Sequence, residues 1–73
     1  MNASILGNII KNRRKDLQLT QRELSVVCDV GARFISDLEN GKETCELGKT
    51  LRVMRSLGLK LEVYDQSHQR ISS

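Results

Sequence analysis

The sequence contains no proline and no tryptophan, and its only aromatic residues are one phenylalanine and one tyrosine. Because it also lacks repeats and low-complexity segments, the chain of 73 residues predicts one small domain without an internal linker. So few aromatic side chains cannot form a surface that stacks unpaired bases. No apolar run approaches the roughly 18 residues of a membrane helix, and the N-terminus lacks the basic segment of a secretory signal. We therefore expect a cytoplasmic protein.

The sequence offers little for metal binding or catalysis. Cys28 and Cys45 lie far apart and form no CxxC pair, and His68 is the only histidine. This is not a zinc-binding spacing, so we predict two reduced, ordinary thiols and no metal. The chain also lacks a glycine-rich phosphate loop and a clustered acid–base pair, and it is too short to enclose a substrate. The sequence therefore predicts neither an enzyme nor a cofactor.

The net charge of +3 is by itself a weak argument for a nucleic-acid partner, but the basic residues are unevenly distributed. Four of the five residues 11–15 are lysine or arginine. Most such runs are the solvated face of a helix. This run gains significance because it precedes the most informative segment of the chain, residues 19–42.

Residues 19–42 predict two short helices joined by a tight turn. Thr20 can cap the first helix, and Glu23, three residues later, can complete a capping box. This helix should stop near Cys28, because Asp29 stands where the turn requires a left-handed residue and aspartate tolerates that conformation better than most.

The second helix of this pair should begin after Gly31 as its N-cap and should end before the turn signal Asn40-Gly41. Two helices in this order form a helix-turn-helix, whose second helix enters the DNA major groove. Arg33 can donate to O6 and N7 of a guanine, the commonest specific contact. Asp37 can accept from a cytosine amino group, or it can be an exposed charge that sets the helix angle. The predicted base-contacting residues are Ala32, Arg33, Ser36 and Asp37.

Three polar residues beside this recognition helix are expected to contact phosphates. Gln21 is the first residue of its helix, where free backbone N–H groups already favour an anion. Asn40 and Lys42 lie in the loop that follows the recognition helix. Phosphate contacts position a protein on the duplex, whereas base contacts specify the sequence. These three residues are therefore predicted to fix the docking position.

Two further helices complete a mostly α fold of four helices. Apolar residues at helical spacing predict one over residues 3–16. After the recognition helix, Thr44 can cap the last helix, and Gly58 ends it. The inward-facing stripe of that helix is predicted to be Leu47, Leu51, Met54 and Leu57.

The segment 59–64 changes to the alternating pattern of a half-buried strand. A single strand cannot satisfy its own backbone donors and acceptors, and a lone apolar edge promotes aggregation. We therefore predict that this strand pairs with its copy across the two-fold axis of a homodimer; the alternative is an extended tail packed on the monomer. The domain then covers residues 1–65, and residues 66–73 form a short polar tail that is expected to be disordered. The apolar residues of the strand are Leu59, Leu61 and Val63.

The helix-turn-helix resembles the lambda-repressor-like (Xre) family. The resemblance implies that Gln21 binds a phosphate and supports the recognition helix, and that Asn40 and Lys42 bind the DNA backbone. It also implies a structural ion pair between Arg14 and Glu39 inside the domain. The shared signature is Leu19-Thr20-Gln21, Glu23-Leu24, Val30, Ile35-Ser36 and Leu38-Glu39-Asn40-Gly41-Lys42.

Three positions depart from that family. Asp29 occupies the turn position where glycine is usual, Gly31 replaces the usual serine or threonine cap, and Ser25 replaces a common alanine. Because Gly31 and Ala32 provide no long side chain for base reading, sequence specificity is expected to depend partly on DNA shape.

The C-terminal half is similar to the HipB-type antitoxins, and this resemblance spans roughly residues 5–65. It implies a dimer that binds palindromic operators in its own promoter, and hence the nucleoid, and that neutralises a HipA-type serine/threonine kinase toxin. The residues that carry it are Glu46-Leu47-Gly48-Lys49-Thr50-Leu51 and Leu57-Gly58-Leu59-Lys60-Leu61-Glu62-Val63.

Two other functions fit the same helices. One is a stand-alone phage-type repressor or a restriction–modification controller, which has no toxin partner. The other is an interaction module that has lost DNA binding. A kinase-like reading frame beside the gene favours the antitoxin, and salt-dependent duplex binding separates any DNA reader from an interaction module.

Overall fold

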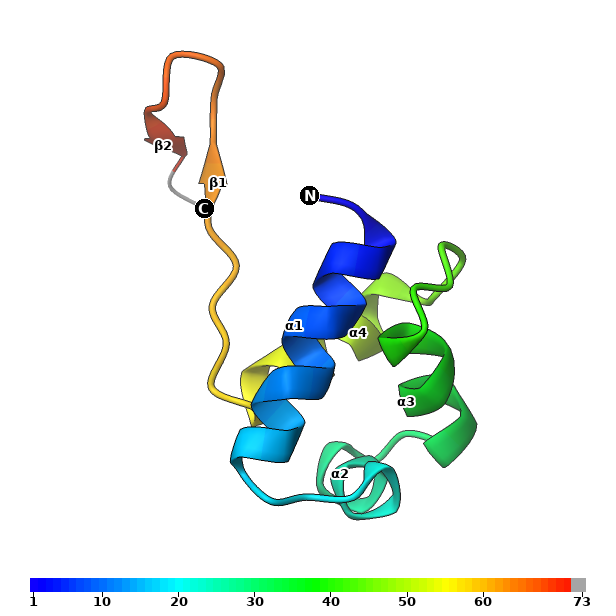
Figure 1. The fold of residues 1–73 in the computed structure, drawn as a ribbon. Helices are drawn as coiled ribbons and strands as arrows, with labels where there is room; N and C mark the ends of the chain where they lie inside the picture. Colours follow the sequence, from blue (N-terminus) through cyan, green and yellow to red (C-terminus); the bar gives the residue numbers. More distant parts are fainter. Residues whose placement is uncertain (72–73) are drawn as a thin grey trace.

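The computed structural model describes residues 1–71, which form four helices and a C-terminal β-hairpin (Figure 1). The predicted mostly α, four-helix architecture is confirmed. None of the helices in this range is long and apolar enough to cross a membrane. The elements are α1 (Ala3–Asp16), α2 (Gln21–Cys28), α3 (Ala32–Glu39), α4 (Leu47–Ser56), β1 (Val63–Tyr64) and β2 (Arg70–Ile71).

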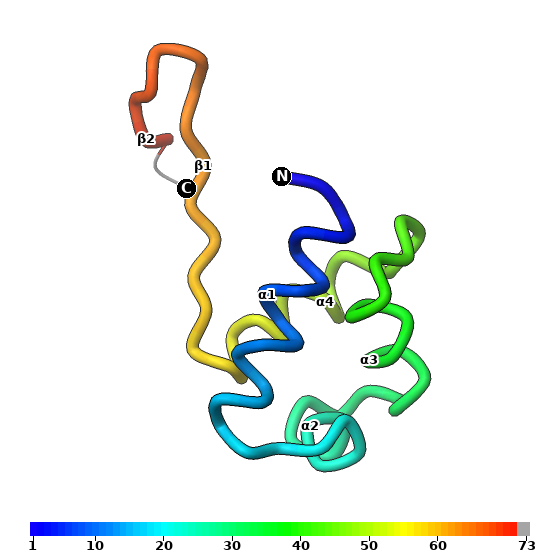
Figure 2. Tube along the Cα trace, in the orientation of Figure 1, coloured from blue at the N-terminus to red at the C-terminus, as the bar shows by residue number. Residues whose placement is uncertain are grey.

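The four helices enclose one small core, and every helix contributes to it. Each helix is too short to be stable alone in water, so the burial of apolar side chains between the helices is what stabilises them. α1, the longest, packs against α3, and α2 packs against both α3 and α4 at one end of the bundle (Figures 1 and 2). The buried apolar residues are Ile10, Leu24, Cys28, Ile35, Leu38, Val53, Met54 and Leu57.

Each helix ends in the same hydrogen-bonded motif, with one left-handed residue just past the helix. In α1, for example, the Leu19 N–H donates to the Arg14 carbonyl and the Gln18 N–H donates to the Lys15 carbonyl. These bonds satisfy carbonyls that a helix end otherwise leaves free. The motif turns the chain sharply, which lets four short helices pack around one core. The left-handed residues are Gln18, Asp29, Gly41 and Gly58.

α1 and α3 approach each other closely at Gly7. A Cβ atom at this position would lie 2.5 Å from the Leu38 carbonyl oxygen and 2.7 Å from that of Glu39. The absence of a side chain therefore allows backbone to pack on backbone. This contact fixes the C-terminal end of the recognition helix α3 against α1.

The start of α4 and its buried face differ from the prediction. Glu46, not Thr44, is the N-cap, and its carboxylate accepts from the N–H groups of Gly48 (3.0 Å) and Lys49 (3.1 Å). Leu47, predicted to face inward, lies in the first turn and is 68% exposed. The rest of the predicted stripe is confirmed, because Met54 and Leu57 are buried and Leu51 is half-buried against the core. The buried residues of α4 and its C-cap are Thr50, Val53, Met54 and Leu57.

The C-terminal segment also differs from the prediction. Instead of a strand over residues 59–64, only Val63–Tyr64 is β-structure, and it pairs antiparallel with Arg70–Ile71 of the same chain. The part of the predicted disordered tail that is described, residues 66–71, supplies the turn and β2. Residues 72–73 lie outside the described residues.

Local hydrogen bonds close this hairpin. One carboxylate oxygen of Asp65 accepts from the Ser67 N–H (3.0 Å), the Ser67 hydroxyl (2.7 Å) and the Gln69 N–H (3.0 Å). These bonds, that of the Ser67 hydroxyl first, lower the pKa of Asp65. The polar composition that suggested disorder thus builds a turn. Figures 1 and 2 show the hairpin projecting from the helices as an arm, so the segment is not a tail packed on the monomer.

Candidate DNA interface

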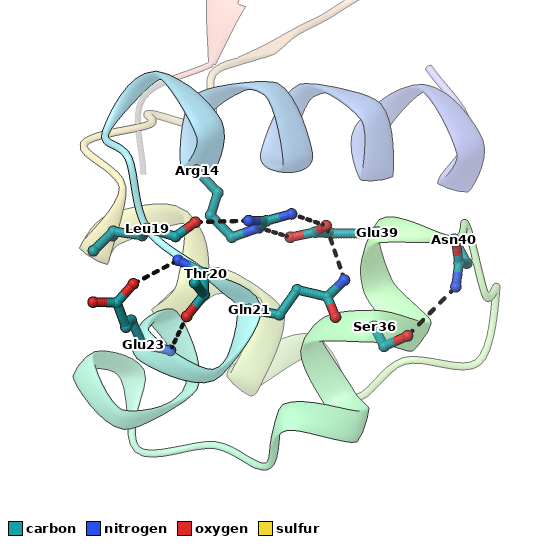
Figure 3. A network of polar contacts seen from close by, with 8 residues as sticks. All are labelled: Arg14, Leu19, Thr20, Gln21, Glu23, Ser36, Glu39 and Asn40. Atoms are coloured by element: carbon teal, nitrogen blue, oxygen red, sulfur yellow. Dashed lines mark hydrogen bonds and ion pairs between the residues drawn. The ribbon is translucent and has the colours of Figure 1, made fainter.

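The first helix of the helix-turn-helix begins with the predicted capping box. The Glu23 N–H donates to the Thr20 hydroxyl oxygen (3.0 Å), and the Thr20 N–H donates to the Glu23 carboxylate (2.8 Å; Figure 3). The backbone hydrogen bond from Thr20, followed by its side-chain bond, lowers the pKa of Glu23. Both ends of this reciprocal pair are local, so the sequence alone fixes where α2 starts.

The turn between α2 and α3 is built as predicted. Asp29 adopts the left-handed conformation, with φ 56° and ψ 49°. The Val30 N–H donates to the Ser25 carbonyl (3.0 Å), which directs the chain back across the end of α2. Gly31 is the N-cap of α3 and, lacking a side chain, makes no capping hydrogen bond. The N-terminus of α3 is therefore left open to solvent.

Glu39, at the end of α3, connects the first three helices (Figure 3). It accepts from Arg14 of α1 twice, at 2.6 Å (Nε) and 3.0 Å (Nη2), and from the Gln21 Nε2 of α2 at 3.2 Å. The side chains of Arg14 and Glu39 are 10% and 1% exposed. The hydrogen bond with Glu39 raises the pKa of Arg14, despite the opposing effect of burial. The ion pair implied by the family resemblance is therefore present.

Gln21 has a defined place in this network. Its amide donates to Glu39, so the side chain lies against the end of α3 while the residue itself stays half-buried at the start of α2. The remaining amide hydrogen and the helix N-terminus can bind a phosphate. The geometry suits both roles expected of Gln21: support of α3 and contact with the DNA backbone.

The predicted base-contacting residues lie on the outer surface of α3. Ala32 and Arg33 are exposed, whereas Ser36 and Asp37 are half-buried. The Arg33 side chain is 92% exposed, and its Nε lies 4.0 Å from the Asp37 carboxylate. The surface thus carries one extended cation with a carboxylate one turn behind it.

The two predicted phosphate contacts after α3 are both exposed. The Asn40 Nδ2 lies 3.5 Å from the Ser36 hydroxyl oxygen, a long hydrogen bond (Figure 3). The Lys42 Nζ lies 3.5 Å from the Asp37 carboxylate. Both side chains therefore lie near the polar surface of α3, and the structure brings base-reading and phosphate-contacting candidates together.

Sequence reasoning missed how other arginines are used. Arg13, in the basic run 11–15, donates from Nε to the carbonyl of Leu57 (2.9 Å), the C-cap of α4. Arg52 donates to the carbonyls of Cys28 (3.4 Å) and Asp29 (3.2 Å), at the C-terminal end of α2. A cation is favourable at the negative end of a helix dipole. No local signal reveals these bonds, because the partners lie far apart in the sequence.

Two exposed cations adjoin the predicted sites and were not singled out. Arg22 follows Gln21 in the first turn of α2. Lys49, in the first turn of α4, lies with its Nζ 5.8 Å from the centroid of the Phe34 ring. Lys49 lies beside α3 and Arg22 beside Gln21 in the sequence, and their charge makes both further candidates for phosphate contact.

Within residues 1–71 no three metal-ligating side chains gather into a possible metal site. Cys28 is a buried core residue and Cys45 is half-buried, and both are free thiols. The chemistry of this surface is therefore that of hydrogen bonds and charge.

Comparison with known proteins gives a consistent result. The sequence model of the Helix-turn-helix family matches residues 10–63. A protein of Sinorhizobium fredii (strain NBRC 101917 / NGR234), described as an uncharacterized HTH-type transcriptional regulator, y4mF, is 40% identical over 65 residues, covering 89% of this chain and 86% of that protein.

Solved structures of HipB are similar over almost the whole chain. The fold matches a chain of a HipA–HipB–O2–O3 complex with a TM-score of 0.81 and 26% identity, covering 90% of this chain and 93% of that one. A HipB–O1–O2 complex matches with a TM-score of 0.80, also at 26% identity, covering 89% and 94% of the two chains. Because about nine-tenths of this chain is covered, these similarities extend past the four helices into the segment that follows α4.

Proposed function

Because this chain belongs to the Xre-like helix-turn-helix family, it is a DNA-binding transcriptional regulator, and we propose that it is the antitoxin and autorepressor of a toxin–antitoxin operon. In this proposal a homodimer binds palindromic operators in its own promoter and neutralises a HipA-type serine/threonine kinase. The observation that carries it is the similarity to chains of HipB complexes over about nine-tenths of the length.

In the proposed complex, α3 enters the major groove with its exposed N-terminal residues toward the bases. Ala32 contacts a thymine methyl group, Arg33 forks onto a guanine, and Ser36 donates or accepts one turn further on. Gln21, Asn40 and Lys42 bind phosphates on either side. The support for this orientation is the network at Glu39, which holds α3 against α1 and α2 and leaves its outer surface to solvent.

The arm supports the proposed homodimer. Leu61, Val63 and Ile71 are 61%, 53% and 54% exposed on a segment that projects from the helices (Figure 2). An open hollow of about 660 Å³ lies between this segment and Arg55 of α4. Since β2 covers only one edge of β1, the other edge, continued by the extended residues 59–62, is available for a second copy. Pairing there buries apolar side chains and satisfies backbone groups together.

Sedimentation equilibrium of the purified chain tests the dimer. Leu61→Pro removes a backbone donor from the proposed strand pair and should yield monomers. Leu61→Ala, which keeps the N–H, is the matched control and should weaken the dimer less. A Leu61→Pro variant that sediments like the parent chain would exclude pairing through this segment.

The toxin partner is tested in cells. If the gene lies beside a kinase-like reading frame, expression of that kinase alone should arrest growth, and co-expression of this chain should restore it. The purified pair should also co-elute. A chain that binds duplexes but neither rescues growth nor binds the kinase is instead a stand-alone repressor or a restriction–modification controller.

Selection of duplexes from a random library tests the regulator itself. Because a two-fold dimer places its recognition helices about one helical turn apart, or a multiple of it, the recovered sites should be palindromic with that spacing. Recovery of half-sites without symmetry would argue against the dimer. If no duplex is recovered above background, the remaining function is that of an interaction module that has lost DNA binding.

A further inference from the structure

One carboxylate oxygen of Asp37 faces both cations of the proposed recognition surface. Its Oδ2 lies 4.0 Å from the Arg33 Nε, one turn earlier on α3, and 3.5 Å from the Lys42 Nζ, in the loop after α3. The side chains of Asp37, Lys42 and Arg33 are 30%, 54% and 92% exposed, respectively. The carboxylate is thus the least exposed member of the group, and the Arg33 side chain extends beyond it into solvent.

The geometry favours one way of presenting Arg33. A guanidinium has an Nε edge and a terminal fork formed by Nη1 and Nη2. Asp37 faces the Nε edge, so the terminal fork is left to donate to O6 and N7 of a guanine. A nearby carboxylate that favours this orientation of Arg33 also reduces the side-chain freedom lost on binding.

We propose that Asp37 is a specificity-determining residue that positions Arg33 for guanine and does not itself read a base. This inference rests on the proposed DNA-binding surface and replaces the earlier expectation that Asp37 accepts from a cytosine. A carboxylate already facing two cations has little to gain from a third donor, and an exposed pair at these distances is loose enough to adjust as Arg33 docks.

The same carboxylate has a second effect through Lys42. A negative charge beside a phosphate-contacting lysine weakens attraction to any duplex, whatever its sequence. Asp37 therefore acts in opposite directions on two kinds of DNA. It strengthens binding where Arg33 meets its guanine and weakens binding everywhere else. A charge without a positioning role does not strengthen binding at the preferred site, and the benefit of a direct base contact would not depend on Arg33.

A double-mutant cycle on two duplexes tests the proposal. The four proteins are the parent chain, D37A, R33A and the double variant R33A/D37A. One duplex is a site recovered by the parent chain from a random library, and the other has the same composition in scrambled order. Dissociation constants are measured by fluorescence anisotropy at one salt concentration. Glu43→Ala removes an exposed carboxylate next to Lys42 that has no ion pair among residues 1–71, and is the matched charge control.

On the selected site, D37A should lose about two- to five-fold in affinity, the range of an exposed ion pair. The same substitution should cause no loss in the R33A background, and it should tighten binding to the scrambled duplex. E43A should tighten binding to both duplexes. An equal loss with and without Arg33 would mean that Asp37 reads a base directly. Tighter binding to both duplexes would mean that it is only a surface charge.

The contact between Asp37 and Arg33 can also be tested by NMR in the free protein, without DNA. In the free protein, the Arg33 Nε–H resonance should move and exchange faster with water in Asp37→Asn than in the parent chain. An unchanged resonance would overturn the proposal, because the pair that positions Arg33 would not exist. If the parent chain selects no duplex, the proposed function fails. If it selects one and the cycle is additive, only the role of Asp37 fails.

Discussion

The guanidinium of Arg14 and the carboxylate of Glu39 form a two-point ion pair, Nε to Oε2 at 2.6 Å and Nη2 to Oε1 at 3.0 Å, between the first helix and the end of the recognition helix. Arg14 also donates from Nη1 to the Leu19 carbonyl at 2.7 Å. The pair is buried, fully hydrogen-bonded and shared with Gln21. It therefore fixes the end of α3, which carries the proposed DNA-reading surface, against α1 and α2.

Removing one partner of this pair should be costly. Arg14→Ala or Glu39→Ala leaves an uncompensated buried charge, and the free energy of unfolding should fall by about 3–5 kcal/mol. The double variant R14M/E39L removes both charges and should be more stable than either single variant. Urea unfolding followed by circular dichroism measures this, with the exposed Arg33→Ala as control. If either single variant lowered the free energy of unfolding by less than about 1 kcal/mol, the pair would contribute no more than an exposed ion pair.

Gly7→Ala should destabilise the chain although alanine is the better helix former. The new Cβ would lie 2.5 Å from the Leu38 carbonyl oxygen, so α1 must move away from α3. The net loss should be about 1–3 kcal/mol, seen as a lower thermal midpoint. Gly31→Ser is the matched control, because a Cβ there meets nothing within 4 Å and serine can cap α3. It should gain about 0.3 kcal/mol.

The capping box should contribute to acid sensitivity. The pKa of Glu23 lies below its ordinary value of 4.5, because the folded chain donates hydrogen bonds to the carboxylate. Its contribution to stability is therefore present above about pH 4.5 and is lost as the pH falls through the lower, folded-state pKa. Glu23→Gln keeps the acceptor and removes the charge, so its thermal midpoint should change less than that of the parent chain as the pH falls from about 5 to about 3.

A matched control for this titration is Glu43→Gln. Glu43 is exposed and makes no side-chain hydrogen bond among the described residues. Its substitution should leave the acid dependence of the parent chain unchanged. If Glu23→Gln and Glu43→Gln give parallel midpoint curves, the capping box does not contribute to the acid sensitivity of the fold.

Two substitutions should separate the proposed phosphate and base contacts. Lys42→Ala should weaken binding evenly across sequences and reduce the slope of log K against log salt by about one unit. Arg33→Ala should relax specificity at one base pair, at a cost of about 1–3 kcal/mol on the preferred site. Titrations of selected and scrambled duplexes at several salt concentrations measure both effects. If Arg33→Ala lowered the affinity equally for every sequence, Arg33 would contact the DNA backbone and not a base.

Local chemistry made much of this fold predictable. The capping box at Thr20, the left-handed Asp29 and the glycine that ends the last helix each act within a few residues, so their effects can be read from the sequence. The start of α4 was not predictable in this way. Thr44 is the better cap by residue preference, yet the Glu46 carboxylate caps α4 by accepting from the N–H groups of Gly48 and Lys49.

In the candidate site, too, some contacts can be predicted from the sequence and others depend on the tertiary structure. The spacing of Arg33 and Asp37 on one helix is a property of the sequence, because residues four apart lie on one face. The approach of Lys42 to the same carboxylate depends on the turn at Gly41, and the bond from Arg13 to Leu57 depends on two helices packing at their ends. Neither contact leaves a sequence pattern.

The sequence alone therefore determined the order and type of the helices, the helix-turn-helix and the family resemblance, because capping, periodicity and turn chemistry are local. Only the tertiary structure decided which arginines are used inside the fold, which face of α4 is buried, and that residues 63–71 close a hairpin instead of fraying. The first two outcomes depend on side chains and backbones that meet across long stretches of chain, where the energy of packing and hydrogen bonding outweighs local preference. The hairpin depends instead on local hydrogen bonds to Asp65, which a polar composition alone does not reveal.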